Sequence, residues 1–207
     1  MKRTSFLFNL LAVSSLASGC ALTSKGTALD VRWFDPEPAK PTLTSASSPV
    51  RARSGRELEL GRVSSGINLR ERIAYRDTAY EIGYYDDKRW TERPEVYVRH
   101  ELARTLFEER GMRRALAGQA PVLDVEVISF EELRGAAPQA RIALRIVVHD
   151  DRQSLSERTI VVDRPIANGK APTDANFNNL VHAMAEALVA VSEQVADETE
   201  TALAAAR

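Results

Sequence analysis

Three long segments of alternating apolar and polar residues in the second half of the chain most restrict the fold that it can adopt. They are PVLDVEVISF (121–130), ARIALRIVVHD (140–150) and SERTIVVDRPI (156–166). Alternation at period two is typical of strands with one buried face and one face in water, and such strands are usually antiparallel. We therefore expect an antiparallel sheet over this part of the chain.

A long helix is predicted from Thr173 onward. Its apolar residues recur at steps of four and three, at Phe177, Val181, Met184, Leu188, Val191 and Val195. This spacing places them on one helix face, as in a helix that covers a sheet. An exposed coiled coil is the alternative, but the apolar stripe is shorter than the roughly three or four heptads that indicate one.

The first half of the chain repeats the order of strands followed by a helix. A strand is predicted at ELELGRV (57–63), and a hairpin at RERIAYRDTAYEIGYY (70–85). A helix is predicted from Pro94 to Gly111, because proline favours a helix start and glycine favours a helix end. LDVRWF (29–34) is either a first short strand or an extended leader without a fixed partner. We expect an α+β fold, with a mostly antiparallel sheet and two main helices packed on one face.

The first nineteen residues have the three regions of an export signal. Lys2 and Arg3 supply positive charge, residues 6–16 are mostly apolar, and small residues at 17–19 precede a cysteine. The apolar run is shorter than the roughly 20 residues that cross a bilayer, so a permanent transmembrane anchor is the less favoured interpretation. We predict a signal peptide over residues 1–19.

Cys20 is the only cysteine in the chain. A small-small-Cys junction after an apolar run is the pattern of a bacterial lipobox, which predicts cleavage after Gly19 and lipid attachment to Cys20. The position three before the cysteine is Ala17, where Leu is usual, and Leu16 stands one step further out. A single thiol has no disulfide partner within the chain, which favours an attachment point. A secreted protein with an incidental cysteine is the alternative.

The predicted lipid attachment indicates the cellular location of the protein. Bacterial lipoproteins that resemble this chain carry several acyl chains, including palmitate, and such anchors hold a protein firmly on a membrane. Residue 21 is Ala. In bacteria similar to the enteric ones, Asp at that position retains a lipoprotein in the inner membrane. We therefore expect the periplasmic face of the outer membrane.

Composition indicates one globular domain after a tether. Residues 20–55 are expected to form the lipidated N-terminus and a flexible tether, because the stretch at 35–55 concentrates four prolines with Ser and Thr. Residues 56–207 are expected to form the domain. Loss of Lys2 and Arg3 with the signal takes the formal charge from -1 to -3, and no stretch of one sign indicates a nucleic-acid partner.

Catalytic and metal-binding patterns are weak. The three histidines (His100, His149 and His182) are scattered over different predicted elements, without the spacing of a metal site. The adjacent acids, Asp86 with Asp87 and Asp150 with Asp151, are expected in turns. We predict no catalytic residues, no metal and no cofactor.

Aromatic residues gather around the predicted hairpin and first helix. Six of the eleven that follow the signal lie between residues 75 and 97: Tyr75, Tyr80, Tyr84, Tyr85, Trp90 and Tyr97. They either pack the hairpin onto the helix or form a docking surface, where Tyr and Trp are enriched. The candidate partner-binding residues are Tyr84, Tyr85, Trp90 and Pro94.

The stretch ERIAYRDTAYEIGYYDDKRWTERPEVYVRHELARTLFEERG (71–111) resembles the ABC-type transport auxiliary lipoprotein family. The shared order is a strand pair, an aromatic and acidic turn, Trp90, and then Pro94 opening a helix with Leu102 and Leu106 on one face. The resemblance continues through DVEVISFE and the last helix, and covers most of 56–196. The Pro/Ser stretch before residue 56 departs from the usual pattern.

This resemblance implies a non-catalytic partner of ABC transporters whose substrate-binding subunits carry mammalian-cell-entry domains. Such transporters move lipids or other hydrophobic compounds between the envelope membranes. The expected partners are therefore a mammalian-cell-entry-domain subunit and, through the lipid anchor, the membrane. The alternative is a structural lipoprotein that binds peptidoglycan or an assembly complex. An enzyme is least favoured, for want of a catalytic constellation.

Overall fold

The computed structural model describes residues 29–37, 55–116, 118, 120–169 and 172–206. The predicted signal peptide (1–19) and the predicted lipid attachment site Cys20 lie outside these residues, as does most of the predicted tether. From Val31 onward the chain forms one compact unit. The domain therefore begins well before residue 56, because residues 32–34 form a strand of the same sheet.

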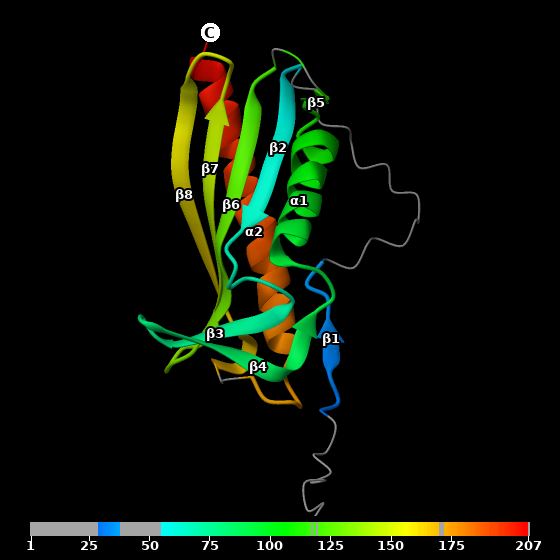
Figure 1. Ribbon diagram of the computed structural model, residues 1–207, viewed down its shortest axis with the longest axis vertical. Helices are drawn as coiled ribbons and strands as arrows, with labels where there is room; N and C mark the ends of the chain where they lie inside the picture. Colours follow the sequence, from blue (N-terminus) through cyan, green and yellow to red (C-terminus); the bar gives the residue numbers. More distant parts are fainter. Residues whose placement is uncertain (1–28, 38–54, 117, 119, 170–171, 207) are drawn as a thin grey trace, which may run out of the picture. The chain divides into compact units, whose positions relative to one another are not determined.

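The described residues form one sheet of eight strands (Figure 1). Of the two interpretations of 29–34, the structure shows the short strand, and it confirms the hairpin and the three long strands of the second half. The strands are β1 (Arg32–Phe34), β2 (Glu57–Ser65), β3 (Arg72–Thr78), β4 (Glu81–Trp90), β5 (Arg113–Arg114), β6 (Val122–Leu133), β7 (Gln139–His149) and β8 (Ser154–Pro165).

The central strand β6 has different partners on its two sides. It pairs with β7 in the antiparallel direction, and β7 pairs with β8 in the same way. On the other side, the first half of β6 runs parallel to β2 and its last residues run parallel to β3. β1 also runs parallel to β4. The prediction of a mostly antiparallel sheet is therefore wrong: the sheet is mixed, because helix α1 returns the chain along the sheet before β6 begins.

Helix α1 spans Pro94–Ala103 and continues as one π-helical stretch, η1 (Arg104–Glu109). Gly111 follows with φ of 66°, the left-handed conformation that glycine tolerates at a helix end. The long helix α2 spans Asn178–Ala205, after the short 3₁₀ turn η2 (Ala167–Gly169). It begins later than the predicted Thr173, whose hydroxyl donates a 2.8 Å hydrogen bond to Asn176 Oδ1 and so favours a turn over a helix start.

The two helices cover one face of the sheet, as predicted. α2 contacts β7 and β8, while α1 contacts β2, β6 and α2. The core face of α2 includes Met184, Leu188, Val191 and Val195 from the predicted stripe, but Leu180 is fully buried where Val181 is only partly buried. In the part of the chain that the structure describes, no helix is both long and apolar enough to span a membrane.

A bulge in β6 changes which residues face the helices. Leu123, Val125 and Val127 are buried at odd positions. The register then shifts between Val127 and Ser129, and residues 129–132 are all buried, with Phe130 and Glu132 fully buried. The bulge therefore brings a carboxylate to the helix-facing side of the sheet, at the end of β6 that pairs with β3.

Candidate functional site

The three histidines lie on separate elements, each beside a different carboxylate. The pairs are His100 with Glu37 at 2.7 Å, His149 with Asp124 at 3.2 Å, and His182 with Glu186 at 3.5 Å. Among residues 29–37, 55–116, 118, 120–169 and 172–206, no three His, Cys, Asp or Glu side chains gather as a metal site would require. The described histidines therefore do not converge on one reacting atom.

The two adjacent pairs of acids have different surroundings. Asp86 and Asp87 lie in β4, not in the predicted turn, and point to different partners, Arg72 and Lys88. Asp150 does lie in a turn, where it accepts hydrogen bonds of 2.8 Å from the backbone N–H groups of Arg152 and Gln153. These bonds stabilise the carboxylate and lower the pKa of Asp150. The contacts of Asp86, Asp87 and Asp150 therefore stabilise a strand and a turn of the fold.

Two of the four candidate partner-binding residues are buried in the domain. Trp90 has no exposed surface, and its ring packs edge-on against Phe130 at 5.5 Å and against Tyr97 at 6.5 Å between centroids. Pro94, at the first position of α1, is also buried. Their positions favour core packing, the first of the two interpretations of the aromatic cluster, for these two residues.

Tyr85 lies in a partly buried polar cluster between β4 and β6. Its hydroxyl donates a 2.6 Å hydrogen bond to Glu132 Oε2, which also accepts one of 3.2 Å from Arg134 Nε. The other oxygen, Oε1, is buried without a hydrogen-bond partner in the described structure. Burial and the bond to Glu132 raise the pKa of Tyr85 well above its usual range, so the phenol stays neutral.

Arg134 joins this cluster to the hairpin. Its guanidinium stacks 3.2 Å from the ring centroid of Tyr75 and lies 4.9 Å from that of Tyr85. The Tyr75 ring covers Gly83, the residue opposite it on β4, where a β-carbon would lie 2.3 Å from the ring. Gly83 therefore leaves the space in which Tyr75 and Arg134 stack.

Lys88 connects the same strand to the residues that precede α2. Its ammonium group is nearly buried and pairs with Asp174 at 2.7 Å and Asp87 at 2.9 Å. It also lies within 5.4 Å of the ring centroids of Tyr85 and Phe177. Burial acts to lower the pKa of Lys88, but its bonds to Asp174 and Asp87 outweigh burial and raise it. Lys88 therefore stays charged and holds the start of α2 against β4.

Tyr84 is the candidate residue with the most accessible surroundings. Its ring is half-buried, its hydroxyl donates a 3.0 Å hydrogen bond to the carbonyl of Asn68, and Arg72 stacks over it at 4.6 Å. Arg72 is itself exposed and lies 3.8 Å from the exposed Asp86. Unlike Tyr85, Tyr84 contacts residues at the surface of the domain.

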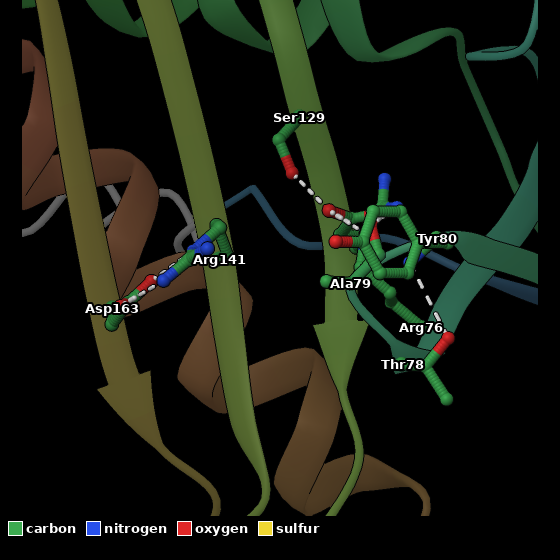
Figure 2. Close-up of polar contacts among 8 residues, drawn as sticks. Arg76, Thr78, Ala79, Tyr80, Ser129, Arg141 and Asp163 are labelled. Atoms are coloured by element: carbon green, nitrogen blue, oxygen red, sulfur yellow. Dashed lines mark hydrogen bonds and ion pairs between the residues drawn. The ribbon is translucent and has the colours of Figure 1, made fainter.

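The tip of the β3–β4 hairpin carries the most exposed aromatic ring of the cluster, Tyr80, at 98%. Figure 2 shows this tip beside a polar network on β3 and β6. Arg76 donates to the carbonyl of Ala79 at 3.2 Å and to Glu131 at 3.1 Å, and Ser129 donates to the same carboxylate at 2.7 Å. These bonds connect the hairpin tip, which carries Tyr80, to β6.

Sequence reasoning located the aromatic cluster but missed the charged residues that organise it. Lys88 lies in β4, whereas Glu132 lies near the end of β6 and Arg134 directly after it, so no local spacing relates Lys88 to the other two. One signal was present: Glu132 follows Phe130 at period two, at a position where an inward-facing strand residue is normally apolar.

The fold is similar to that of proteins with solved structures. The crystal structure of protein XCC0632 from Xanthomonas campestris matches with a TM-score of 0.66 at 19% identity, over 83% of this chain and 96% of that one. The hypothetical protein CT253 from Chlamydia trachomatis matches with a TM-score of 0.52 at 10% identity, over 73% of this chain and 99% of that one. At these identities the likeness shows a shared fold.

Sequence comparison gives the family. No curated protein matches the chain. The family model described as "ABC-type transport auxiliary lipoprotein component" matches residues 37–196, which is more than half of the chain and includes seven of the eight strands. The match confirms the resemblance, which covers most of 56–196, and it begins earlier in the chain, at residue 37. The chain therefore belongs to the family of ABC-type transport auxiliary lipoprotein components.

Proposed function

We propose that this protein is a non-catalytic, lipid-anchored component of an ABC-type transport system that moves lipids or other hydrophobic compounds across the periplasm. The observation that carries the proposal is the family match over residues 37–196. The arrangement of the three histidines supports a non-catalytic role, since they lie on separate elements and each pairs with a different carboxylate.

The anchor in this proposal is Cys20, exposed by cleavage after Gly19. The signal-like residues 1–19 and the single cysteine support it. Residue 21 is Ala and not the Asp that retains lipoproteins in the inner membrane, which supports the periplasmic face of the outer membrane as the destination. Since the compact unit begins at Val31, only ten residues separate it from the acylated cysteine. The domain is then held close to the membrane surface.

The partner in this proposal is the mammalian-cell-entry-domain subunit of the transporter, and the docking edge is the segment from Tyr84 to Pro94. Two kinds of contact along this segment support the proposal. Tyr84, next to the exposed Arg72, offers an aromatic and cationic contact. Tyr85, Trp90 and Pro94 fix the backbone of the edge from behind through their buried contacts. Rigid aromatic residues are common at protein interfaces.

A tagged full-length copy, purified from solubilised envelopes, tests the proposal. We expect the transporter subunits to co-purify with the parent protein and to be lost with Tyr84→Ala. The matched control is Tyr80→Ala, which removes an exposed tyrosine from the hairpin tip. Recovery of peptidoglycan or of an outer-membrane assembly complex in place of transporter subunits would contradict the proposal.

A further inference from the structure

One face of the β1, β4 and β3 strands carries a row of aromatic and cationic side chains. Trp33 of β1 is in register with Arg89 of β4, and Arg89 is in register with Arg72 of β3. Side chains at registered positions lie on the same face of a sheet. Val31 precedes Trp33 by two residues and so faces the same way. We call these four residues the Trp33 face.

The apolar residues of the Trp33 face are exposed, whereas apolar residues on the opposite face of the same strands are buried in the core. Trp33 is 58% exposed and Val31 36%, whereas Phe34 is 8% exposed and Trp90, in register with it, is fully buried. In the described sheet β1 pairs only with β4, so Trp33 lies in an edge strand. The exposed indole at the sheet edge, beside Val31, offers an apolar surface to which another surface can bind.

The two arginines of the Trp33 face have an electrostatically unfavourable arrangement. Arg72 and Arg89 are directly opposite one another, where like charges repel. The Arg89 guanidinium donates to the carbonyls of Tyr85 and Lys88, at 2.9 and 2.8 Å, and among the described residues no carboxylate pairs with it. Asp86 is the nearest acid to Arg72, at 3.8 Å and mostly in water. The face therefore has an excess of positive charge, which an anionic partner would neutralise.

We propose that the Trp33 face rests on a lipid bilayer that bears anionic headgroups. Arginine pairs with phosphate oxygens in a bidentate geometry, and Trp is enriched at the level of the headgroups. The position of the face in the chain favours a membrane over an acidic protein. Val31 follows Cys20 by eleven residues, which reach about 40 Å at most.

This inference rests on the proposed anchor at Cys20, and it adds an orientation to the proposed function. Tyr84 stacks on Arg72, the last residue of the row. A transporter subunit that docks at Tyr84 therefore lies beside the bilayer surface.

The two tryptophans make the proposal directly measurable, because Trp33 is exposed and Trp90 is buried. The purified full-length lipoprotein is reconstituted into vesicles of phosphatidylcholine and phosphatidylglycerol, with or without bromine on the acyl chains. Brominated lipid is expected to quench the fluorescence of the parent and of Trp90→Phe, in which only Trp33 emits. Trp33→Phe, in which only Trp90 emits, is expected to keep its full emission. Unquenched Trp33 in anionic vesicles would overturn the proposal.

Charge reversal provides the second arm. Arg72→Glu with Arg89→Glu is expected to abolish the quenching of Trp33, whereas Arg152→Glu, in an exposed turn, is expected to leave it unchanged. Equal quenching of Trp33 in the parent, in the double variant and in Arg152→Glu would contradict the binding of the Trp33 face to anionic lipid. A protein interface would give a different result. In that case vesicles would fail to quench Trp33, and Trp33→Phe would abolish co-purification of transporter subunits or change the sedimentation mass. That result would overturn the proposal.

The mass of the purified chain separates this proposal from the proposed anchor. A chain without acyl groups whose Trp33 is still quenched on added vesicles would support the Trp33 face and contradict the anchor at Cys20. An acylated chain whose Trp33 is not quenched would support the anchor and contradict the Trp33 face.

Discussion

Tyr85 and Glu132 join β4 to β6 through a hydrogen bond of 2.6 Å on the helix-facing side of the sheet. Glu132 has no exposed surface, and one of its oxygens has no hydrogen-bond partner in the described structure. A buried carboxylate is costly unless its partners hold it. The hydrogen bond from Tyr85 therefore contributes to the stability of the domain.

Tyr85→Phe is expected to lower the free energy of unfolding by about 1–3 kcal/mol, because Glu132 then keeps only Arg134 as a partner. Urea denaturation measures the loss. Tyr84→Phe is the matched control, since its hydroxyl bonds to the Asn68 carbonyl at the surface, and it should change the stability much less. Equal losses in the two variants would show that the Tyr85 hydroxyl has no special role.

Stability is also expected to fall at alkaline pH in a way that depends on Tyr85. The pKa of this phenol is raised in the folded domain, while an unfolded tyrosine titrates near pH 10. Above about pH 10 the unfolded chain releases a proton that the folded chain retains, so the free energy of unfolding decreases as pH rises. The contribution is fully present below that pH. The difference in stability between parent and Tyr85→Phe, measured from pH 8 to pH 11 by urea denaturation, should shrink above about pH 10.

Trp90→Ala is expected to destabilise the domain by about 3–5 kcal/mol, because it empties a fully buried site between Tyr97 and Phe130. Thermal melting checks this. Trp90→Phe keeps most of the apolar volume and should lose much less. An unchanged melting temperature for Trp90→Ala, together with lost transporter binding, would instead make Trp90 a direct docking residue.

Gly83→Ala is expected to displace the Tyr75 ring, because the added methyl would lie 2.3 Å from it. The cost should be about 1–3 kcal/mol, typical of overpacking. The double variant Gly83→Ala with Tyr75→Ala removes the clash, so the two effects should be strongly non-additive in a double-mutant cycle. Additive effects would show that the ring adapts freely.

Cys20→Ala is expected to leave an unprocessed precursor that retains residues 1–19, since the single thiol is the only predicted lipid attachment point. Intact-mass measurement and labelling with an alkyne fatty acid report cleavage and acylation. Cys20→Ser offers the same test with a smaller change in side-chain shape. A variant that is labelled as strongly as the parent would exclude Cys20 as the anchor.

The sequence by itself determined the secondary elements of this protein and its family. Period-two alternation identified the three long strands, and Pro94 and Gly111 set the limits of the first helix, because these signals are local properties of the backbone and side chains. The spacing of Met184, Leu188 and Val191 likewise identified the core face of α2. The order of these elements carried the family resemblance, which the match over 37–196 confirms.

Tertiary structure alone decided how the strands pair and which charges meet. Parallel pairing of β2 and β3 with β6 depends on where α1 returns the chain, and β1 joins the sheet across more than fifty residues of sequence. The bulge after Val127 turns Glu132 inward, and the same packing leaves Trp33 outside while burying Trp90. Which strands pair, and in which direction, is set by contacts between distant segments, and the period-two alternation of a single strand does not specify its partner.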